Sequence, residues 1–150
     1  MTRPTPHTGT IVSSGYEGRT LDEFVDALRL HRVDVLIDVR LTPISRKKGF
    51  SKTALSEALA AADIEYRHEP ELGNPKDNRD AFRRGQRAAR TRYARHLSNG
   101  ANETFQATVE SARGARVALL CFERDHSQCH RSCITDRAQA EHPGLSVLRV

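Results

Sequence analysis

The sequence predicts an α/β fold: a single three-layer domain of about five mainly parallel strands with helices on both faces. Short apolar runs such as Val33–Val39 alternate with stretches in which apolar residues recur at helical spacing. No internal repeat, low-complexity tract or Pro/Gly/Ser linker divides the 150 residues. Because strands separated by helices of about 10 to 15 residues form parallel βαβ units, we expect helices to cover both faces of one sheet.

The first half of the chain alternates strand and helix. Residues 1–9 are expected to form a disordered or extended tail, and residues 10–150 the single domain. Thr20 and Glu23 have the spacing of a capping box, which predicts the start of a helix. The other elements predicted here are three strands, Thr10–Ser14, Val33–Val39 and Ile64–His68, and a helix that Ser51 caps, with apolar positions from Leu55 to Ala62.

The second half begins with an arginine-rich helix predicted over Arg79–Leu97. Its residues Phe82, Ala89, Tyr93 and Leu97 repeat at helical spacing, so one face is expected to pack on the sheet. The remaining predicted elements are a helix over Asn102–Arg113, a strand over Arg116–Glu123, a helix over Arg131–Glu141 and a last strand over Leu145–Val150. The pattern leaves the order of the strands open.

Composition excludes several classes of protein. The longest apolar runs are far shorter than the 18 or so residues of a membrane span, so we expect no membrane association. The first ten residues contain no apolar stretch of the kind that secretory signals have. The three cysteines are odd in number and lie late in the chain, which is untypical of a disulfide framework. These features predict a cytoplasmic protein.

The formal charge of +5 comes from one segment. Residues 76–96 contain eight Lys and Arg against two Asp, a charge of +6, which leaves −1 for the rest of the chain. A basic helix can bind nucleic-acid phosphates, here through Arg83, Arg87 and Arg90. It can equally be a solvated face or the contact surface of a homodimer, and the segment has no known nucleic-acid recognition motif.

Polar residues follow the first two predicted strands, at the edge where open parallel sheets bind ligands. The first strand is followed by Gly15, Tyr16 and Glu17, in a GYEG sequence whose glycines let the backbone approach a ligand. Asp38 lies in a buried strand and therefore needs either a partner, such as Arg40, or a role in proton transfer. The candidate substrate-binding residues of the second loop are Arg40, Ser45 and Arg46, whose guanidinium groups can hold a phosphate or carboxylate.

The densest polar cluster is CFERDHSQCHRSC, over residues 121–133. Cys129, His130 and Arg131 stand where a loop enters a helix, and the helix N-terminus there favours a thiolate or a bound anion. Cys129 is therefore a candidate nucleophile, with Glu123 and His130 as candidates for proton transfer and Arg131 as an anion ligand. We expect Cys121 and Cys133 to be packing residues.

A metal centre would need ligands from the same cluster. The spacing of Cys121, Cys129, His130 and Cys133 matches neither CxxC nor the paired clusters of zinc modules, and adjacent ligands at 129 and 130 are awkward. The prediction is therefore no metal and no cofactor.

Three segments resemble the domain of unknown function 488 family: GYEGRTLDEFVDALRLHRVDVLIDVRLTPISRKKGFSK, ELGNP and LLCFERDHSQCHRS. The resemblance runs in order from about Thr10 to Val150 and implies a compact α/β domain, without implying an activity. The family's shared motifs correspond here to Gly15, Tyr16, Glu17, Asp38, Arg40, Pro43, Ser45, Arg46, Leu72, Gly73, Cys121, Glu123, Cys129, His130 and Arg131.

A weaker similarity links the chain to rhodanese-like sulfurtransferases. The IDVR strand is similar, as is a late strand that ends at Cys121 ahead of a helix starting at Arg131. The spacing differs, because the rhodanese loop places its cysteine five residues before its arginine. Here Cys121 precedes Arg131 by ten residues and Cys129 by two.

Together these observations predict an enzyme, a hydrolase or transferase, that acts on a phosphate-bearing or nucleotide-like anionic substrate. The pocket would lie at the carboxyl edge of the sheet, with Cys129, Glu123, His130 and Asp38 as catalytic candidates. Two alternatives stay open. The chain could be a nucleic-acid-binding or nucleic-acid-processing domain, or a ligand-binding domain without catalytic activity.

Overall fold

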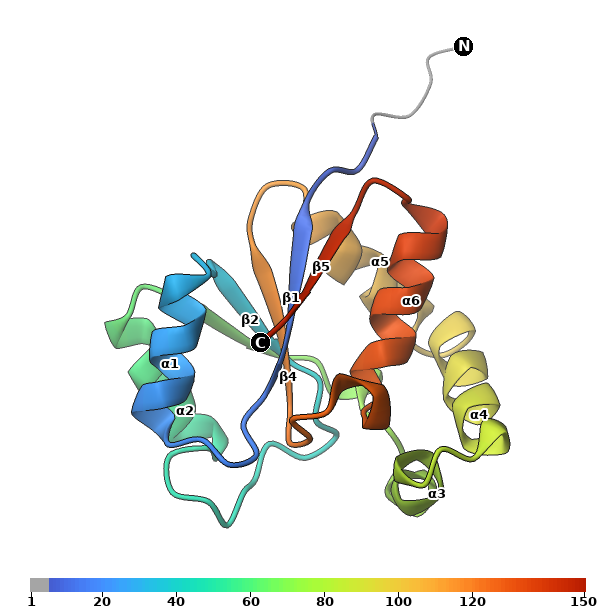
Figure 1. Ribbon diagram of the computed structural model, residues 1–150, viewed down its shortest axis with the longest axis horizontal. Coiled ribbons are helices and arrows are strands. Elements are labelled where there is room, and N and C mark those ends of the chain that lie inside the picture. Colours follow the sequence, from blue (N-terminus) through green and yellow to red (C-terminus); the bar gives the residue numbers. More distant parts are fainter. Residues whose placement is uncertain (1–5) are drawn as a thin grey trace.

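The computed structural model describes residues 6–150 and contains a five-stranded sheet in which every strand pair is parallel, with the order β3-β2-β4-β1-β5 (Figure 1). The predicted three-layer α/β class is confirmed. The strands are β1 (Thr10–Gly15), β2 (Val35–Asp38), β3 (Glu65–His68), β4 (Val117–Cys121) and β5 (Ser146–Arg149). The helices are α1 (Leu21–Leu30), α2 (Lys52–Ala61), α3 (Arg79–Arg83), α4 (Arg87–Ser98), α5 (Asn102–Ser111) and α6 (Arg131–Glu141), with 3₁₀ turns at Pro70–Leu72, Lys76–Asn78 and His126–Gln128.

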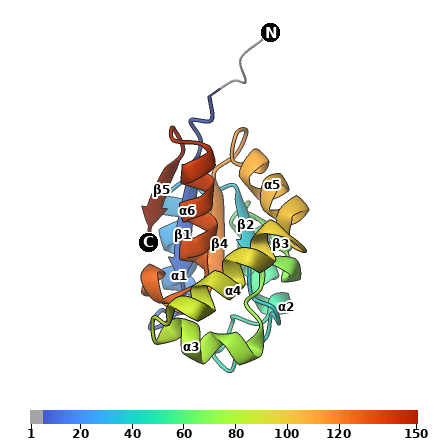
Figure 2. The ribbon, with the colours of Figure 1, turned by 90° about the vertical axis from the view of Figure 1, so that its right-hand side faces the viewer.

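The handedness of the crossovers decides which helices cover which face. The chain moves in one direction along the sheet from β1 to β2 to β3, through α1 and α2, and in the other direction from β3 to β4 to β5. Right-handed connections therefore place α1 and α2 on one face and α4, α5 and α6 on the other, with α3 at the carboxyl edge of the sheet (Figures 1 and 2). Two apolar clusters result, one around Phe24, Leu36 and Leu59 and the other around Tyr93 and Phe105.

Local sequence explains where several helices begin and end. The Thr20 hydroxyl accepts a hydrogen bond from the Glu23 amide at 3.1 Å, and the Glu23 carboxylate accepts one from the Thr20 amide at 3.0 Å, as the capping box predicts. Ser51 is the N-cap residue of α2, but its hydroxyl does not cap the helix. It donates instead to the Ser45 carbonyl and accepts from the Ser45 amide, so Ser51 fixes the loop before α2.

The single arginine-rich helix predicted over Arg79–Leu97 is wrong. The segment forms two helices, α3 and α4, separated at residues 84–86. Gly85 has a φ of 76°, and Gln86 is extended, so the helical ladder cannot continue through this point. The break turns α3 toward the carboxyl edge of the sheet, while Ala89, Tyr93 and Leu97 of α4 pack in the core.

At the N-terminus, residues 1–5 of the expected tail lie outside the described residues, and the division into tail and domain stays a prediction. His7 is buried, with its Nε2 2.7 Å from the Val109 carbonyl oxygen. Among the helices of residues 6–150, none is both long and apolar enough to cross a membrane.

Candidate active site

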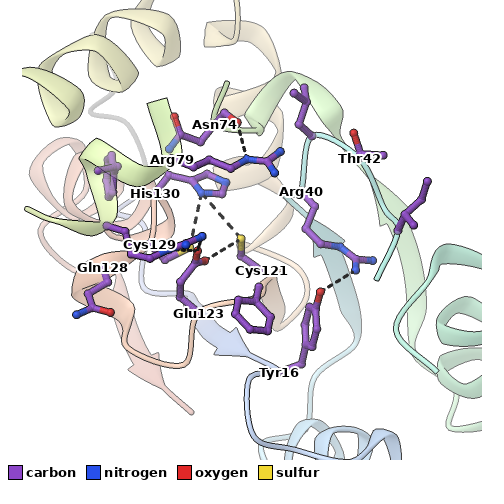
Figure 3. Close-up of a pocket in the computed structure, with 15 residues that line it drawn as sticks. Tyr16, Arg40, Thr42, Asn74, Arg79, Cys121, Glu123, Gln128, Cys129 and His130 are labelled. Carbon is purple, nitrogen blue, oxygen red and sulfur yellow. Dashed lines mark hydrogen bonds and ion pairs between the residues drawn. The ribbon is translucent and has the colours of Figure 1, made fainter. Parts of the chain in front are cut away.

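A pocket with a volume of about 230 Å³ opens at the carboxyl ends of β1, β2 and β4 (Figure 3). After β4 the chain leaves toward the face covered by α6, whereas after β1 and β2 it leaves toward the opposite face. Such a divergence opens the crevice in which open α/β sheets bind ligands. The lining residues are Tyr16, Arg40, Leu41, Thr42, Ile44, Asn74, Arg79, Phe82, Arg83, Cys121, Phe122, Glu123, Gln128, Cys129 and His130.

Gly15, the last residue of β1, allows the segment that follows β4 to pass close to the end of β1. Gly15 pairs with Cys121 on the neighbouring strand β4, and a Cβ atom at position 15 would lie 2.0 Å from the Glu123 carbonyl oxygen. Only a residue without a side chain fits this approach. Gly15 thus places Glu123 at the pocket without lining the pocket itself.

Asp38 and Arg40 form a buried ion pair behind the pocket. The Asp38 carboxylate accepts hydrogen bonds from Arg40 Nε at 2.8 Å, from Arg40 Nη2 at 2.7 Å, from the Arg40 amide at 3.1 Å and from the Tyr66 hydroxyl at 2.5 Å. Burial works to lower the pKa of Arg40, but these bonds to Asp38 outweigh it and raise that pKa above its usual range. Of the two roles open for Asp38, partnership with Arg40 is the one that its contacts support.

The Arg40 guanidinium then positions Tyr16. Its Nη1 donates to the Phe50 carbonyl oxygen at 2.6 Å and to the Tyr16 hydroxyl at 3.3 Å. Tyr16 is also stacked on Phe50, with ring centroids 4.4 Å apart. Arg40 and Tyr16 therefore form a rigid wall of the pocket, with both side chains held by groups outside it.

The opposite wall contains two thiols and an imidazole. His130 Nδ1 lies 3.6 Å from Cys129 Sγ and 4.0 Å from Cys121 Sγ, and all three atoms lie within 4.8 Å of one another. His130 Nε2 is 2.9 Å from the Val39 carbonyl oxygen, so this nitrogen carries a proton and Nδ1 faces the thiols. Figure 3 shows the three side chains converging at the pocket.

Arg131 and Glu123 complete this cluster. Arg131 is buried behind the pocket, where its Nε donates to Cys129 Sγ at 3.2 Å and its Nη2 donates to the Glu123 carbonyl. Glu123 Oε2 lies 3.4 Å from Cys121 Sγ, and Glu123 Oε1 accepts from Arg83 Nη2 at 3.0 Å. The Glu123 carboxylate therefore lies between the Cys121 thiol and the Arg83 guanidinium, with one oxygen near each.

The surroundings favour charge on one of the two thiols. Burial works to raise the pKa of Cys129, but the hydrogen bond from Cys121 and the charges of His130 and Arg131 hold this pKa well below its usual range. The hydrogen bond to Cys129, together with burial, raises the pKa of Cys121. Burial works to lower the pKa of His130, yet the neighbouring Cys129 raises it. Both shifts have the direction that favours transfer of the Cys129 proton to His130.

Three cationic side chains line the pocket. Besides Arg40, the pocket is lined by Arg79 and Arg83, one turn apart on α3. Arg79 Nε donates to the carbonyl oxygen of the buried Asn74 at 3.3 Å, which fixes the guanidinium over the pocket, as Figure 3 shows. Arg83 is half exposed and held by Glu123. Among residues 6–150, Arg79 has no carboxylate partner, so it is the cation of this pocket best placed to meet an anion.

The structure brings together part of the predicted site. Tyr16, Arg40, Glu123, Cys129 and His130 line the pocket. Gly15, Asp38 and Arg131 lie directly behind it, in contact with lining residues. Three candidates lie away from the lining: Glu17 accepts from the Arg124 amide, Ser45 from the Lys47 amide, and Arg46 is exposed in the same loop.

Several lining residues were missed by the reasoning from sequence. Cys121 was expected to be a packing residue, but it lines the pocket. Asn74 and Arg79 come from the crossover between β3 and β4, far along the chain from the strand-end loops. The ELGNP segment, which contains Asn74, was the available signal. Arg83 and Arg90 were grouped with Arg87 as a nucleic-acid surface, yet Arg83 lies in this pocket and Arg90 stacks over Phe82 at 5.0 Å.

Fold and site together define a class: a parallel α/β domain with a buried thiol–imidazole pair in an arginine-lined pocket. The family model described as domain of unknown function DUF488 matches residues 20–138. The chain belongs to this family, as its motifs predicted. No significant match to the chain was found among curated proteins or among solved structures.

Proposed function

We propose that this protein is a cysteine-dependent hydrolase or transferase that acts on a phosphate-bearing or nucleotide-like anionic substrate. The observation that carries the proposal is the Cys129–His130 pair, 3.6 Å apart, in a pocket that Arg40, Arg79 and Arg83 also line. A thiolate next to an imidazolium is the activated form of a cysteine nucleophile. The Arg79 guanidinium supplies donors of the kind that an anionic group requires, whereas those of Arg40 are held by Asp38, Tyr16 and Phe50.

The chemical step follows from the positions of these groups. Cys129 Sγ would donate its electron pair to the electrophilic atom of the substrate while that atom's bond to the leaving oxygen breaks. The leaving oxygen would take the proton from His130 Nδ1, the ring nitrogen on the side of Cys129, because Nε2 is bound to the Val39 carbonyl. A water molecule, or a second acceptor in a transferase, would then displace the thiolate, returning its proton to His130.

Iodoacetate tests the combination of thiolate and anion site. It is a small anion whose alkylation of a thiolate forms a C–S bond and releases iodide. After a metal chelator has been applied and removed, Cys129 should react with iodoacetate faster, relative to neutral iodoacetamide, than glutathione does. Arg79→Gln should lower this ratio about tenfold, as the loss of one charge-assisted contact implies.

A matched control is Arg95→Gln, which removes one charge from α4 outside this pocket and should leave the ratio unchanged. Mass spectrometry identifies the labelled residue. Labelling that falls on Cys133, or a ratio equal to that of glutathione, would contradict the proposal.

A panel of phosphate esters and nucleotides then tests turnover, which Cys129→Ser and Glu123→Gln should abolish while circular dichroism stays native. Binding without turnover would identify a ligand-binding domain instead.

A second function, nucleic-acid binding, is favoured by one observation. A shallow groove on α4 is lined by Arg87, Thr91, Arg92 and Arg95, and among residues 6–150 neither Arg87 nor Arg95 has an ion-pair partner. Exposed unpaired arginines along one helix can contact successive phosphates. Oligonucleotide affinity that falls steeply with salt in the natural protein, and is lost in Arg87→Gln/Arg95→Gln, would support this function. An affinity insensitive to salt would exclude it.

A further inference from the structure

We infer that Cys121, Cys129 and His130 form a binding site for one thiophilic divalent cation, of which Zn²⁺ is the type. Their three ligand atoms come from two segments, the end of β4 and the two residues just before α6, and lie within 4.8 Å of one another. All three side chains are buried at one side of the pocket. This inference concerns the same pocket as the proposed function but does not depend on it.

The distances suit a tetrahedral ion. With zinc–sulfur and zinc–nitrogen bonds of about 2.3 and 2.0–2.1 Å, tetrahedral geometry places a sulfur about 3.6 Å from a nitrogen and two sulfurs about 3.8 Å apart. Nδ1 of His130 is already 3.6 Å from Cys129 Sγ and 4.0 Å from Cys121 Sγ. Adjacency of residues 129 and 130 in sequence is therefore no obstacle, because their ligand atoms converge.

Groups around the three residues match the usual outer shell of a metal site. A histidine ligand typically donates its second ring N–H to a backbone carbonyl, and His130 Nε2 does so to Val39 at 2.9 Å. This bond leaves Nδ1 as the coordinating nitrogen. Arg131 Nε donates to Cys129 Sγ at 3.2 Å, which fixes the direction of that sulfur.

The fourth position would face the pocket. Glu123 Oε2 lies 3.4 Å from Cys121 Sγ, close to the separation that a tetrahedral ion imposes between a sulfur and an oxygen ligand. Arg83 occupies the other carboxylate oxygen, so Oε2 stays directed at the thiols. The negative charges of two thiolates and one carboxylate would balance the positive charges of the ion and of the neighbouring Arg131.

Binding has a direct consequence for the proposed chemistry. Each sulfur shares one electron pair with the ion, and the protons of the cysteine and histidine ligands pass to solvent. The lone pairs that remain on a zinc-bound Cys129 are less nucleophilic than those of the free thiolate, because the ion withdraws their charge. Zinc binding therefore competes with the thiol chemistry, and a zinc ion would act as a reversible inhibitor of the free-thiol enzyme.

Cobalt and zinc titrations of the full chain test the site. One Co²⁺ per chain should produce a thiolate-to-cobalt charge-transfer band and the intense visible bands of a tetrahedral ion. One Zn²⁺ should displace it. Zinc should also protect Cys121 and Cys129, but not Cys133, from iodoacetamide. The natural protein provides this last readout without any substitution, so a folding defect in a variant cannot obscure it.

Variants assign the ligands. Cys129→Ser and His130→Gln should each weaken zinc binding by more than a hundredfold, and Arg131→Lys by about 10- to 100-fold, as expected for an outer-shell group. Cys133→Ser is the matched control, because Cys133 lies in the first turn of α6, close to the ligands in sequence but outside the cluster. The zinc affinity of this variant should be unchanged.

Octahedral cobalt spectra, or protection that spreads equally to Cys133, would overturn the inference. The two proposals fail separately. Zinc binding without preferential carboxymethylation of Cys129 removes only the thiol enzyme, whereas that preference without zinc binding removes only the metal site.

Discussion

Two buried polar clusters lie at the same edge of the sheet, and they differ in how completely their groups are paired. At the end of β2, the Asp38 carboxylate accepts four hydrogen bonds between 2.5 and 3.1 Å. At the end of β4, the shortest contacts of His130 Nδ1 with Cys129 and Cys121 are 3.6 and 4.0 Å. The first cluster has no remaining capacity for a ligand. The second has reactive atoms that a ligand, an electrophile or a metal ion can still engage.

This difference suggests a division of labour. The Asp38–Arg40 pair belongs to the framework, since its removal would leave a buried charge without compensation. In the proposed function the thiol cluster carries the chemistry, and its loose pairing is tolerated because sulfur forms weak hydrogen bonds and packs as a small apolar group. Substitutions in the first should therefore mainly change stability, and substitutions in the second mainly reactivity.

The largest expected effect is on stability in Asp38→Ala. Arg40 is only 6% exposed and would lose its counter-ion, so the free energy of unfolding should fall by about 3–5 kcal/mol. Urea denaturation measures this change. Glu65→Ala is the matched control, because the Glu65–Arg67 pair is largely exposed and should contribute less than about 1 kcal/mol. Equal effects in the two variants would show that the buried pair is not part of the framework.

The next largest loss of stability is expected in Gly15→Ala. Gly15 lies at the end of β1, beside the segment of β4 that leads into the thiol cluster. The added Cβ would meet the Glu123 carbonyl oxygen at 2.0 Å, so the segment after β4 must shift. We expect a loss of about 1–3 kcal/mol in the free energy of unfolding, as for other overpacked sites. The iodoacetate preference of Cys129 should fall as well, because Glu123 and Arg83 move together. Gly114→Ala, where the Cβ would have open space, is the control and should change neither quantity.

Cys129→Ser should affect stability least among these substitutions while abolishing turnover. The serine keeps the size of the side chain approximately and can still accept from Arg131, so we expect a loss of about 1–2 kcal/mol from burying a hydroxyl. Denaturation and the turnover panel are measured on the same preparation. A loss of stability as large as that of Asp38→Ala would assign Cys129 to the framework and remove the distinction between the clusters.

The sequence predicts the pocket residues that directly follow strands, but not those that reach the pocket from another part of the chain. The strand-end rule correctly gathered Tyr16, Arg40, Glu123, Cys129 and His130, because residues after parallel strands share one edge whatever the strand order. Asn74 and Arg79 escaped it. They reach the pocket only because the right-handed crossover from β3 to β4 carries α3 over that edge, and no local pattern encodes that path.

Local conflicts explain the other misses. The apolar spacing from Phe82 to Leu97 predicts one continuous helix, but Gly85 adopts a positive φ that ends α3. Cys121 has the apolar neighbours of a core strand and is buried, as a packing residue would be. Only the arrangement of β4 beside β1 and β2 places its sulfur 4.0 Å from His130 Nδ1, so a buried residue also lines the pocket there.

The smallest predicted effect is on the pH dependence of stability and concerns His126, a third buried polar group. In the completeness of its hydrogen bonding, His126 is intermediate between the two clusters. Its Nδ1 is 2.6 Å from the Ser13 hydroxyl and its Nε2 is 3.2 Å from the Thr135 hydroxyl. Burial lowers its pKa below the usual value of 6.5, as do the charges of Arg149 on β5 and Arg131 on α6, against the opposing influence of Cys129 and Asp136. The folded protein therefore keeps His126 neutral to lower pH than the unfolded chain does.

A lowered histidine pKa means that the unfolded state binds more protons as the pH falls through 6.5. The contribution of His126 to the free energy of unfolding should thus be fully present above pH 6.5 and decrease below it. His126→Gln, which keeps a hydrogen-bonding side chain without this titration, should show a smaller loss of stability between pH 7 and pH 5 than the natural protein. Urea midpoints across that range measure the difference between the two proteins, which cancels the other titrating groups. Parallel pH profiles would mean that Ser13 and Thr135 satisfy the protonated ring as well as the neutral one, and His126 would then join the fully paired framework beside Asp38.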